Sequence, residues 1–205
     1  MPGLTINCFD ERGEEVVHES FRFDGGVVDF VDWLSNDGAV TDTWHIQGEG
    51  TFTETVQALD PESGHLRAVE TERICEVDCA LRWGIGYDAQ LESFVNIIAT
   101  PKGGTHVAGF EQAVLKVLRS QVDKNTRKLK VSAKDGRPEK DDVLAGMTAV
   151  VTVRFPEPQF EGQTKEILGT PQIRTVVARV VGDWLESKFA SSKRDDKQQT
   201  SALLE

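Results

Sequence analysis

The first part of the chain alternates apolar and polar side chains with a period of two. Residues 4–10 and 15–23 both follow this pattern, and the polar turn Asp10-Glu11-Arg12-Gly13-Glu14 joins them. Such an arrangement predicts a β-hairpin. A chain that opens directly in a hairpin suggests a piece of a longer protein. After Asp24-Gly25-Gly26, the apolar spacing predicts a short amphipathic helix that ends near Asn36-Asp37-Gly38.

The next segments are mostly strand-like. Residues 41–83 contain the clear alternating runs 51–56 and 74–83, and Asp60-Pro61-Glu62-Ser63-Gly64 predicts a turn between them. Residues 93–100 are almost continuously apolar, which predicts one strand with a central place in its sheet.

Helical spacing replaces this pattern at about residue 105. An apolar stripe predicts a helix from about residue 105 to 122, with Thr105 as its N-cap. The polar and basic residues 124–140 are expected to form a loop, after which Asp141 caps one further helical turn. The apolar stripe consists of Val107, Phe110, Val114, Leu118 and Val122.

The last third of the chain predicts a strand, a loop and a long helix. Residues 147–155 alternate and indicate a strand, and Thr170-Pro171 supplies an N-cap followed by proline at the first helical position. A broad apolar face then predicts a helix that reaches residue 189. The polar residues 191–205 are expected to extend it and to need a neighbouring domain. The order of elements indicates an α+β or α/β sandwich, with helices on one face of a mixed sheet.

Composition limits the classes of protein that fit this pattern. The 205 residues are 39% hydrophobic and 28% charged, as in an ordinary globular protein. No apolar run approaches the roughly 20 residues that span a bilayer, and the start resembles no signal peptide, so we expect no membrane contact and a cytoplasmic location. The net charge of −11 argues against a general grip on nucleic acid, so any contact with DNA would be local.

Cysteine and histidine give no sign of a metal or redox site. Cys8, Cys75 and Cys79 lack paired C-x-x-C spacing, and in a strand Cys75 and Cys79 would stand about 13 Å apart. This separation excludes a disulfide, so reduced thiols in the core are expected. His18, His45 and His65 have no metal-binding spacing.

The segment with the most distinctive chemistry is Phe160-Glu161-Gly162-Gln163-Thr164-Lys165. If its backbone is extended, Gln163 and Lys165 point the same way, roughly 7 Å apart, and their amide and ammonium groups converge on one small anion such as a terminal phosphate. Gly162 and Gly169 provide backbone freedom, and Pro156 and Pro158 end the strand before the loop. An ordinary solvated surface loop is the alternative.

Two other segments carry weaker signals. Gly103-Gly104-Thr105-His106 offers free N–H groups at a helix start, although a tight connection with a locally hydrogen-bonded His106 is the simpler interpretation. Lys102, next to it, either contacts DNA or is simply exposed. The basic residues beyond the helix form either a solvated face or a weak DNA contact; they are Arg119, Lys124, Arg127, Lys128 and Lys130.

Several of these segments occur together in one protein family. Residues 93–110, which include Gly103-Gly104-Thr105-His106, combine with Gly162-Gln163-Thr164-Lys165 to resemble the transducer domain of the ATPase subunit of bacterial type IIA DNA topoisomerases, the B-type subunit of topoisomerase IV or of DNA gyrase. Asp24-Gly25-Gly26, Ala80-Leu81-Arg82-Trp83 and residues 141–151 follow in the family's order. The resemblance covers nearly the whole chain.

The resemblance implies a fold and a domain division. The fold is a four-stranded mixed sheet backed by helices, with a left-handed βαβ crossover, of the ribosomal-protein domain-2-like transducer type, preceded by a β-hairpin. Residues 1–23 would be the end of the ATPase domain and a linker, residues 24–190 the transducer domain, and residues 191–205 a connector towards the next domain.

The resemblance also implies a function. Gln163, Thr164 and Lys165 would bind the γ-phosphate of ATP, with Gln163 and Lys165 in catalytic roles, while an ATPase domain holds most of the ATP and its Mg²⁺. The full-length subunit would be an ATP-hydrolysing DNA topoisomerase whose partners are DNA, a second copy of the subunit and the DNA-cleaving A-type subunit. The loop would couple hydrolysis to domain movement and strand passage, and the fragment alone would be inactive.

Other function classes compete with this one. A small-molecule kinase has a related fold, but the chain lacks a glycine- and serine-rich phosphate loop. The transducer of a mismatch-repair-type ATPase shares the architecture and a nucleotide-contacting lysine, yet Gly103-Gly104-Thr105-His106 together with Gln163-Thr164-Lys165 favours the topoisomerase. A plain dimerisation domain is the remaining alternative.

Overall fold

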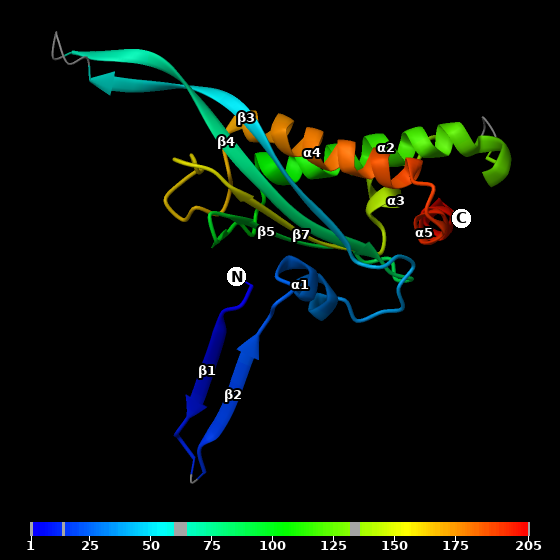
Figure 1. The fold of residues 1–205 in the computed structure, drawn as a ribbon, viewed down its shortest axis with the longest axis horizontal. Coiled ribbons are helices and arrows are strands. Elements are labelled where there is room, and N and C mark those ends of the chain that lie inside the picture. Colours follow the sequence, from blue (N-terminus) through cyan, green and yellow to red (C-terminus); the bar gives the residue numbers. More distant parts are fainter. Residues whose placement is uncertain (1, 14, 60–64, 132–135, 205) are drawn as a thin grey trace.

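The computed structural model describes residues 2–13, 15–59, 65–131 and 136–204. Figure 1 shows a twisted sheet with two long helices on one face and a separate hairpin that projects from the opposite side. The predicted turn at residues 60–64 and part of the predicted loop, residues 132–135, lie outside the described residues.

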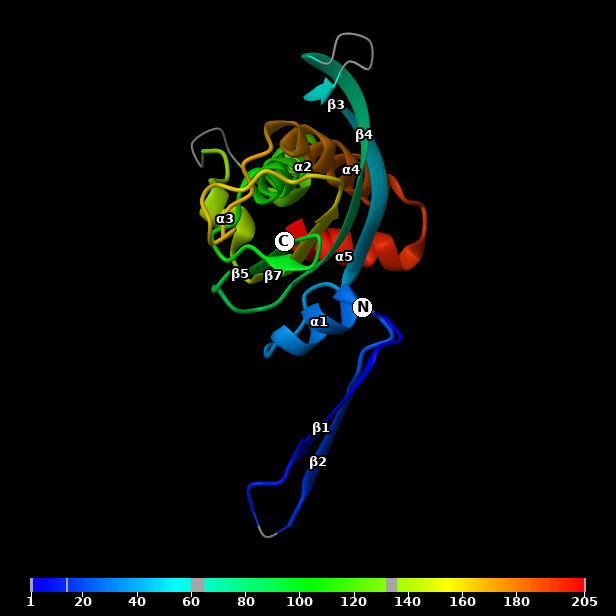
Figure 2. The same cartoon turned by 90° about the vertical axis from the view of Figure 1, so that its left-hand side faces the viewer.

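The projecting hairpin is formed by β1 (Thr5–Asp10) and β2 (Val17–Arg22), which pair antiparallel as the alternation predicts. The short helix α1 (Val27–Leu34) follows, and its sequence position is also as predicted. Figure 2 shows α1 between this hairpin and the main sheet.

The main sheet has the strand order β3-β4-β7-β5-β6 within the described residues. Its strands are β3 (Trp44–Leu59), β4 (Leu66–Trp83), β5 (Gln90–Val95), β6 (Ile98–Ala99) and β7 (Met147–Arg154). β5 and β7 are parallel neighbours and the other pairs are antiparallel, so the expected α+β fold with a mixed sheet is confirmed, with five strands because the short β6 adds to the edge.

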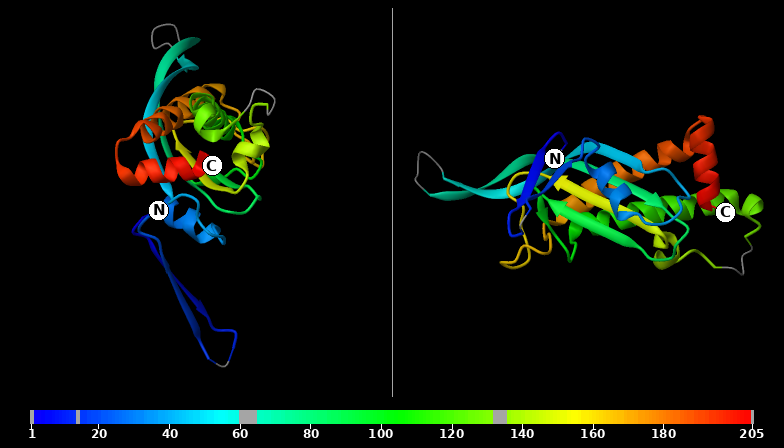
Figure 3. Two further views of the ribbon diagram at one scale, coloured as in Figure 1. Left: turned by 90° about the vertical axis from the view of Figure 1, so that its right-hand side faces the viewer. Right: turned by 90° about the horizontal axis from the view of Figure 1, so that it is seen from below.

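Helices cover this sheet unequally. α2 (Thr105–Leu129) and α4 (Pro171–Ala190) lie side by side on one face. The shorter α3 (Lys140–Leu144) contacts α2, and α5 (Arg194–Leu204) follows the end of α4, as Figure 3 shows. Alternate side chains of β4 and β7 serve the two faces: Cys79 and Val151 join the large core under α2 and α4, whereas Ala80 and Val150 pack against α1. No described helix is long and apolar enough to cross a membrane.

Glycines allow α4 to approach its neighbours closely. A Cβ atom on Gly109 of α2 would lie 2.4 Å from the Arg174 carbonyl oxygen, and one on Gly48 of β3 would lie 2.8 Å from a methyl group of Val180. These distances are too short for real Cβ contacts, so the backbones of α2, α4 and β3 pack at separations that other residues would prevent.

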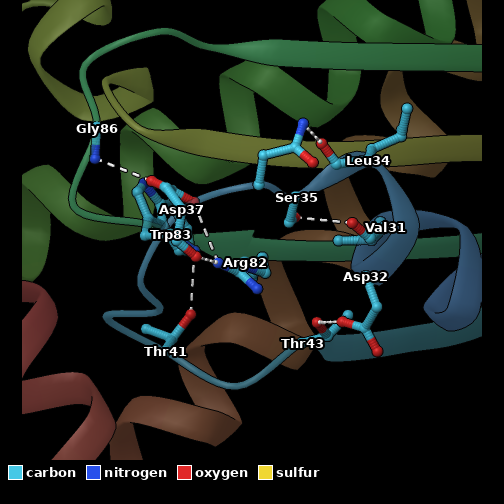
Figure 4. Close-up of polar contacts among 11 residues, drawn as sticks. Val31, Asp32, Leu34, Ser35, Asp37, Thr41, Thr43, Arg82, Trp83 and Gly86 are labelled. Carbon is cyan, nitrogen blue, oxygen red and sulfur yellow. Dashed lines mark hydrogen bonds and ion pairs between the residues drawn. The ribbon is translucent and has the colours of Figure 1, made fainter.

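A polar junction fastens α1 to the end of β4. The Asp37 carboxylate accepts hydrogen bonds from the Gly86 N–H (2.9 Å) and from Arg82 Nη2 (3.1 Å), and the Trp83 N–H donates to Thr41 Oγ1 (3.1 Å), as Figure 4 shows. A Cβ atom at Gly84 would meet Asp37 Oδ2 at 2.0 Å. The junction therefore fixes the loop after α1 at the end of the sheet where β7 begins.

The single strand predicted for residues 93–100 is wrong. β5 stops at Val95, and the chain reverses at Asn96 and Ile97, whose φ angles are +47° and +75°. Asn96 explains the reversal, because its side chain accepts from the Phe155 N–H (3.0 Å) and donates to the Phe155 carbonyl (2.8 Å). β7, with β4 on one side and β5 on the other, takes the central place.

Three predicted helix boundaries are also wrong. α2 continues through Lys124 to Leu129, with a kink at Asn125, so the expected loop begins later. The N-cap of α2 is Gly104 rather than Thr105, because the Thr105 hydroxyl donates instead to the Thr170 carbonyl (2.8 Å). Glu139, not Asp141, is the N-cap of α3. The N-cap at Thr170 and the proline at the start of α4 are confirmed.

The C-terminal segment does not extend α4. It forms the separate helix α5, which packs on residues of this chain: Trp44 Nε1 donates to Gln199 Oε1 (2.7 Å), and Lys188 Nζ donates to Asp196 Oδ1 (2.5 Å). Leu203 and Leu204 add apolar contacts with the core. The expected extension of α4 is therefore wrong, while the need for a neighbouring domain stays a prediction.

The cysteines are all free thiols, as predicted. Cys75 and Cys79 are buried, and desolvation raises the pKa of both to about 12, so neither is reactive at neutral pH. Cys8 is exposed on the projecting hairpin, which corrects the expectation that all three lie in the core.

The close contact at Gly109 gives a stability prediction. Gly109→Ala should lower the free energy of unfolding by about 1–3 kcal/mol, because the new methyl group collides with the Arg174 backbone. Gly182→Ala is the matched control: its Cβ would lie 4.0 Å from the nearest atom, so the better helix propensity of alanine should leave stability equal or up to about 1 kcal/mol higher. Urea denaturation measures both, and equal effects of the two substitutions would contradict the proposed close packing.

Candidate functional site

The loop between β7 and α4, residues 155–170, is a narrow hairpin with its own backbone pairing. The Gly169 N–H donates to the Gln159 carbonyl (2.8 Å), and the Glu161 N–H donates to the Ile167 carbonyl (2.9 Å). Phe160 and Leu168 form an antiparallel bridge between these two bonds. The loop is the gold connection at the left of Figure 1. Its stem is therefore ordered by backbone hydrogen bonds.

The stem of the loop is docked on the start of α2. The Leu168 N–H donates to the Gly103 carbonyl and the Thr105 N–H donates to the Leu168 carbonyl, both at 3.0 Å. Gly104 makes this possible, because its φ of +132° favours glycine and a Cβ atom there would lie 2.4 Å from the Leu168 nitrogen and oxygen. Leu168 itself is fully buried.

The tip of the loop is a tight turn at Gly162-Gln163-Thr164-Lys165. The Lys165 N–H points back to the Gly162 carbonyl (3.4 Å), and the φ angles of Gly162 and Lys165 are +86° and +57°. The extended backbone predicted for Gln163 and Lys165 is therefore wrong: a turn requires the positive φ that Gly162 supplies. All residues from 161 to 165 are exposed, so the prediction that this segment reaches outward is confirmed.

Charges around the tip leave the lysine ammonium without a carboxylate. Glu166 accepts from Lys102 Nζ (2.7 Å) and from the Thr164 hydroxyl (3.1 Å), and these two bonds lower the pKa of its carboxyl group. Lys165 has no ion pair within the described residues, and its Nζ lies 6.0 Å from the centre of the Phe160 ring. The tip therefore presents an exposed cation and an exposed amide side chain, which suit an anion with several oxygens.

The neighbouring helix start is partly engaged by hydrogen bonds within the chain. The Thr105 N–H is already bonded to Leu168, and His106 is completely buried. Its Nε2 is hydrogen-bonded to Thr100 Oγ1 (3.1 Å), whose oxygen is 2.8 Å from Ser93 Oγ. The local hydrogen bonding predicted for His106 is confirmed. Desolvation lowers its pKa to about 4, so the imidazole is neutral at pH 7.

The remaining candidates have mainly structural contacts. Lys102 is exposed and paired with Glu166, and Arg119 Nε donates to the Pro138 carbonyl (2.7 Å). The other basic residues of the run lie on or next to the last turns of α2. No group of three histidine, cysteine, aspartate or glutamate side chains in the described part of the chain is arranged to hold a metal ion.

Sequence reasoning did not single out the residues that hold the loop in place. Asn96 binds the backbone of Phe155 at its entry, and Glu54 and Arg73 contact Gln159 and Glu157. Their partners are distant in sequence, so no local pattern shows the pairing. The available signal was Pro156-Glu157-Pro158, which indicates a rigid entry to the loop.

Comparison with known families and sequences gives a consistent result. The family model described as DNA gyrase B matches residues 26–205. The B-type subunit of DNA gyrase from Streptomyces coelicolor is 36% identical over 90% of this chain, and that from Campylobacter jejuni is 35% identical over 96%. The chain spans 27% and 22% of the length of these two relatives.

Solved structures give the same result. The 43K ATPase domain of Thermus thermophilus gyrase B, solved with an aminocoumarin, matches 99% of this chain with a TM-score of 0.67 and 26% identity; the match covers 48% of that structure. The B-type subunit of DNA gyrase from Myxococcus xanthus has a TM-score of 0.63 at 25% identity over 99% of this chain and 54% of its own. The ATP-binding domain of Francisella tularensis topoisomerase IV, at 22% identity and a TM-score of 0.61, shows the same fold.

The buried histidine beneath the loop gives a pH prediction. The folded-state pKa of His106, about 4, is below its ordinary value of 6.5, so the unfolded chain binds the extra proton between these values. The contribution of neutral His106 to the free energy of unfolding should be fully present above pH 6.5. As the pH falls towards 4, the free energy of unfolding should decrease by roughly 2–3 kcal/mol. Urea denaturation of the wild type and of His106→Asn from pH 7.5 to 4.5 isolates the contribution of His106. If the free energy of unfolding changed with pH in the same way for both proteins, the prediction would be wrong.

Proposed function

The chain belongs to the DNA gyrase B family, and from this premise we propose that it is the transducer region of an ATP-dependent type IIA DNA topoisomerase. In this proposal, Gln163, Thr164 and Lys165 bind the γ-phosphate of ATP held by an adjacent ATPase domain. The loop then couples the loss of that phosphate to domain movement and the passage of DNA. The observation that carries the proposal is the exposed Lys165 ammonium, free of carboxylates, on a loop with an anchored stem.

The side chains at the tip suit this role chemically. A lysine ammonium is a compact charge that stabilises the negative charge on a transferred phosphoryl group, and a glutamine amide donates a hydrogen bond or orients the attacking water. The pairing of Glu166 with Lys102 supports the proposal, because it engages the carboxylate of the residue next to Lys165. ATP supplies the phosphoryl group that is transferred to water, while this chain supplies the contacts that respond to its departure.

The position of the loop links it to the helices. Leu168 is bonded to the start of α2, and Thr170, the N-cap of α4, accepts the Thr105 hydroxyl hydrogen bond. A displacement of the stem would therefore act on α2 and α4 together. We infer that release of the tip after hydrolysis moves these helices as a unit, which is how a small change at a phosphate becomes a domain rotation.

Apolar surface on the projecting hairpin supports a further domain beside it. Leu4, Ile6, Phe21 and Phe23 are exposed and line a cleft of about 550 Å³. The cleft is also lined by Phe30 and Trp33 of α1, by Phe94 of β5 and by Ile97 in the turn after β5. Such a large exposed apolar surface marks an interaction site. We propose that residues 1–23 complete an ATPase domain that packs here, that residues 24–190 form the transducer domain, and that residues 191–205 connect to the next domain.

The proposed partners follow from the family. The Thermus thermophilus structure is described as an ATPase domain, and this chain covers 48% of it, which leaves room there for a nucleotide-binding unit. We propose that this unit holds most of the ATP and its Mg²⁺. DNA, a second copy of the subunit and the DNA-cleaving A-type subunit would be the partners of the complete protein.

Removal of the Lys165 ammonium group should specifically affect ATP hydrolysis. In a B-type subunit that includes the ATPase domain, Lys165→Ala should lower kcat for ATP hydrolysis about 100-fold or more, because the transition-state charge loses its partner. Gln163→Ala should lower it about 10-fold. Lys197→Ala, which removes an exposed lysine from α5, is the control and should retain the wild-type rate. A coupled ATPase assay measures all three, and wild-type turnover by Lys165→Ala would refute the assigned role.

The isolated chain should not hydrolyse ATP. The proposed γ-phosphate contacts lie on an exposed tip, and the described residues gather no metal-binding cluster around it. Phosphate release from the 205-residue chain with ATP and Mg²⁺ should equal that of buffer. Sustained turnover that survives repeated purification would instead favour the kinase-like alternative.

A further inference from the structure

The entry to the loop contains a strained residue. Glu157 has a φ of +55°, although it lies between Pro156 and Pro158. A residue before proline prefers extended backbone, and a non-glycine residue with positive φ is uncommon, so this conformation persists only where its surroundings enforce it. The contacts of Glu157 and its neighbours therefore identify what holds the loop in its observed position.

Those contacts come from the long β3–β4 hairpin. Arg73 Nη2 of β4 donates to Glu157 Oε2 (2.7 Å), and Arg73 Nε lies 3.8 Å from Glu54 Oε2 of β3. Glu54 Oε1 in turn accepts from Gln159 Nε2 (3.1 Å). One chain of polar contacts thus joins both strands of the hairpin to two residues of the loop.

Burial separates this cluster from an ordinary surface ion pair. The side chains of Arg73 and Glu54 are 21% and 11% exposed, whereas those of Arg154 and Glu76, an ion pair between β7 and β4, are 59% and 58% exposed. Exposed pairs contribute little, but a partly buried charge that loses its partner is costly. Arg73 and Glu54 therefore have a strong reason to stay paired with each other and with the loop.

The hairpin reaches the loop beyond the body of the sheet. β7 pairs with β4 from Glu76 to Trp83, so Arg73 lies past the last paired residue. Phe52, the register partner of Arg73 on β3, packs edge-on against Phe155, with ring centres 5.7 Å apart. The free part of the β3–β4 hairpin therefore adds both apolar and polar contacts at the loop entry.

We propose that Arg73 and Glu54 are positioning residues for the Gly162–Lys165 tip, acting through Glu157 and Gln159. They hold the entry of the loop in its strained conformation and thereby fix the position of the exposed tip. The long β3–β4 hairpin then contributes to phosphate sensing as well as to the sheet. This inference rests on the proposed function of Lys165.

Hydrogen exchange on the 205-residue chain tests the positioning step without nucleotide. Amides of residues 155–168 should exchange about 10-fold faster in Arg73→Gln and in Glu157→Gln than in the wild type, and Arg73→Lys should give an intermediate rate because it keeps the charge. Arg154→Gln is the control, since it removes an exposed ion pair between β7 and Glu76 of β4 and leaves the contacts of Glu157 and Gln159 in place. Unchanged exchange in both Arg73→Gln and Glu157→Gln would overturn the inference.

ATP turnover in a B-type subunit with its ATPase domain tests the consequence. Arg73→Gln and Glu157→Gln should each lower kcat about 5- to 20-fold with little change in KM, because another domain holds most of the nucleotide. In a Lys165→Ala background, Arg73→Gln should cause no further decrease in kcat, because Arg73 acts on turnover through the position of Lys165. An equal loss in both backgrounds would show a general structural effect and overturn the inference.

The two proposals fail in different ways. If Lys165→Ala has wild-type turnover, the proposed function is wrong and the role of Arg73 in sensing falls with it. If Lys165→Ala is impaired but Arg73→Gln and Glu157→Gln turn over at the wild-type rate, the proposed function stands and only the positioning role is overturned. Glu157 is 69% exposed, so its substitution leaves a folded protein even if loss of Arg73 does not.

Discussion

The position of the loop between β7 and α4 depends on two backbone hydrogen bonds of Leu168. One joins it to Gly103 and the other to Thr105, the residues on either side of Gly104. Leu168 donates to Gly103 and accepts from Thr105, so the loop stem is joined to α2 at its first residue. Only a residue without a Cβ atom permits this contact, because a Cβ atom on Gly104 would lie 2.4 Å from the Leu168 backbone. The strand-to-helix connection and the loop are consequently one structural unit.

This unit divides the loop into a fixed stem and an exposed tip. The stem is buried at Leu168 and paired by backbone hydrogen bonds up to Glu161, whereas residues 162–165 are exposed and make their hydrogen bonds within the turn and with Glu166. A sensor of a phosphate on another domain needs both properties. In the proposed function, the exposed tip would enter a pocket of the neighbouring domain, and the fixed stem would transmit its movement to α2 and α4.

The sequence predicted most of the fold because hydrophobic periodicity determines it. The hairpin, α1, β7 and α4 follow from local patterns, and Gln163 and Lys165 were found as an exposed pair. The failures share a cause: Asn96 reverses the chain by binding Phe155, and Thr105 caps nothing because it binds Thr170. These contacts join residues far apart in sequence, so propensity alone could not reveal them.

The same reason explains why the sequence did not reveal the contacts between the β3–β4 hairpin and the loop. Glu54 and Arg73 resemble ordinary polar positions of an alternating strand, and their proximity follows only from the register in which Phe52 pairs with Arg73. Their largely buried charges require partners, and Glu157 and Gln159 are within reach. In the proposed positioning role, the contacts of these charges with Glu157 and Gln159 offset the cost of the strained φ angle at the loop entry.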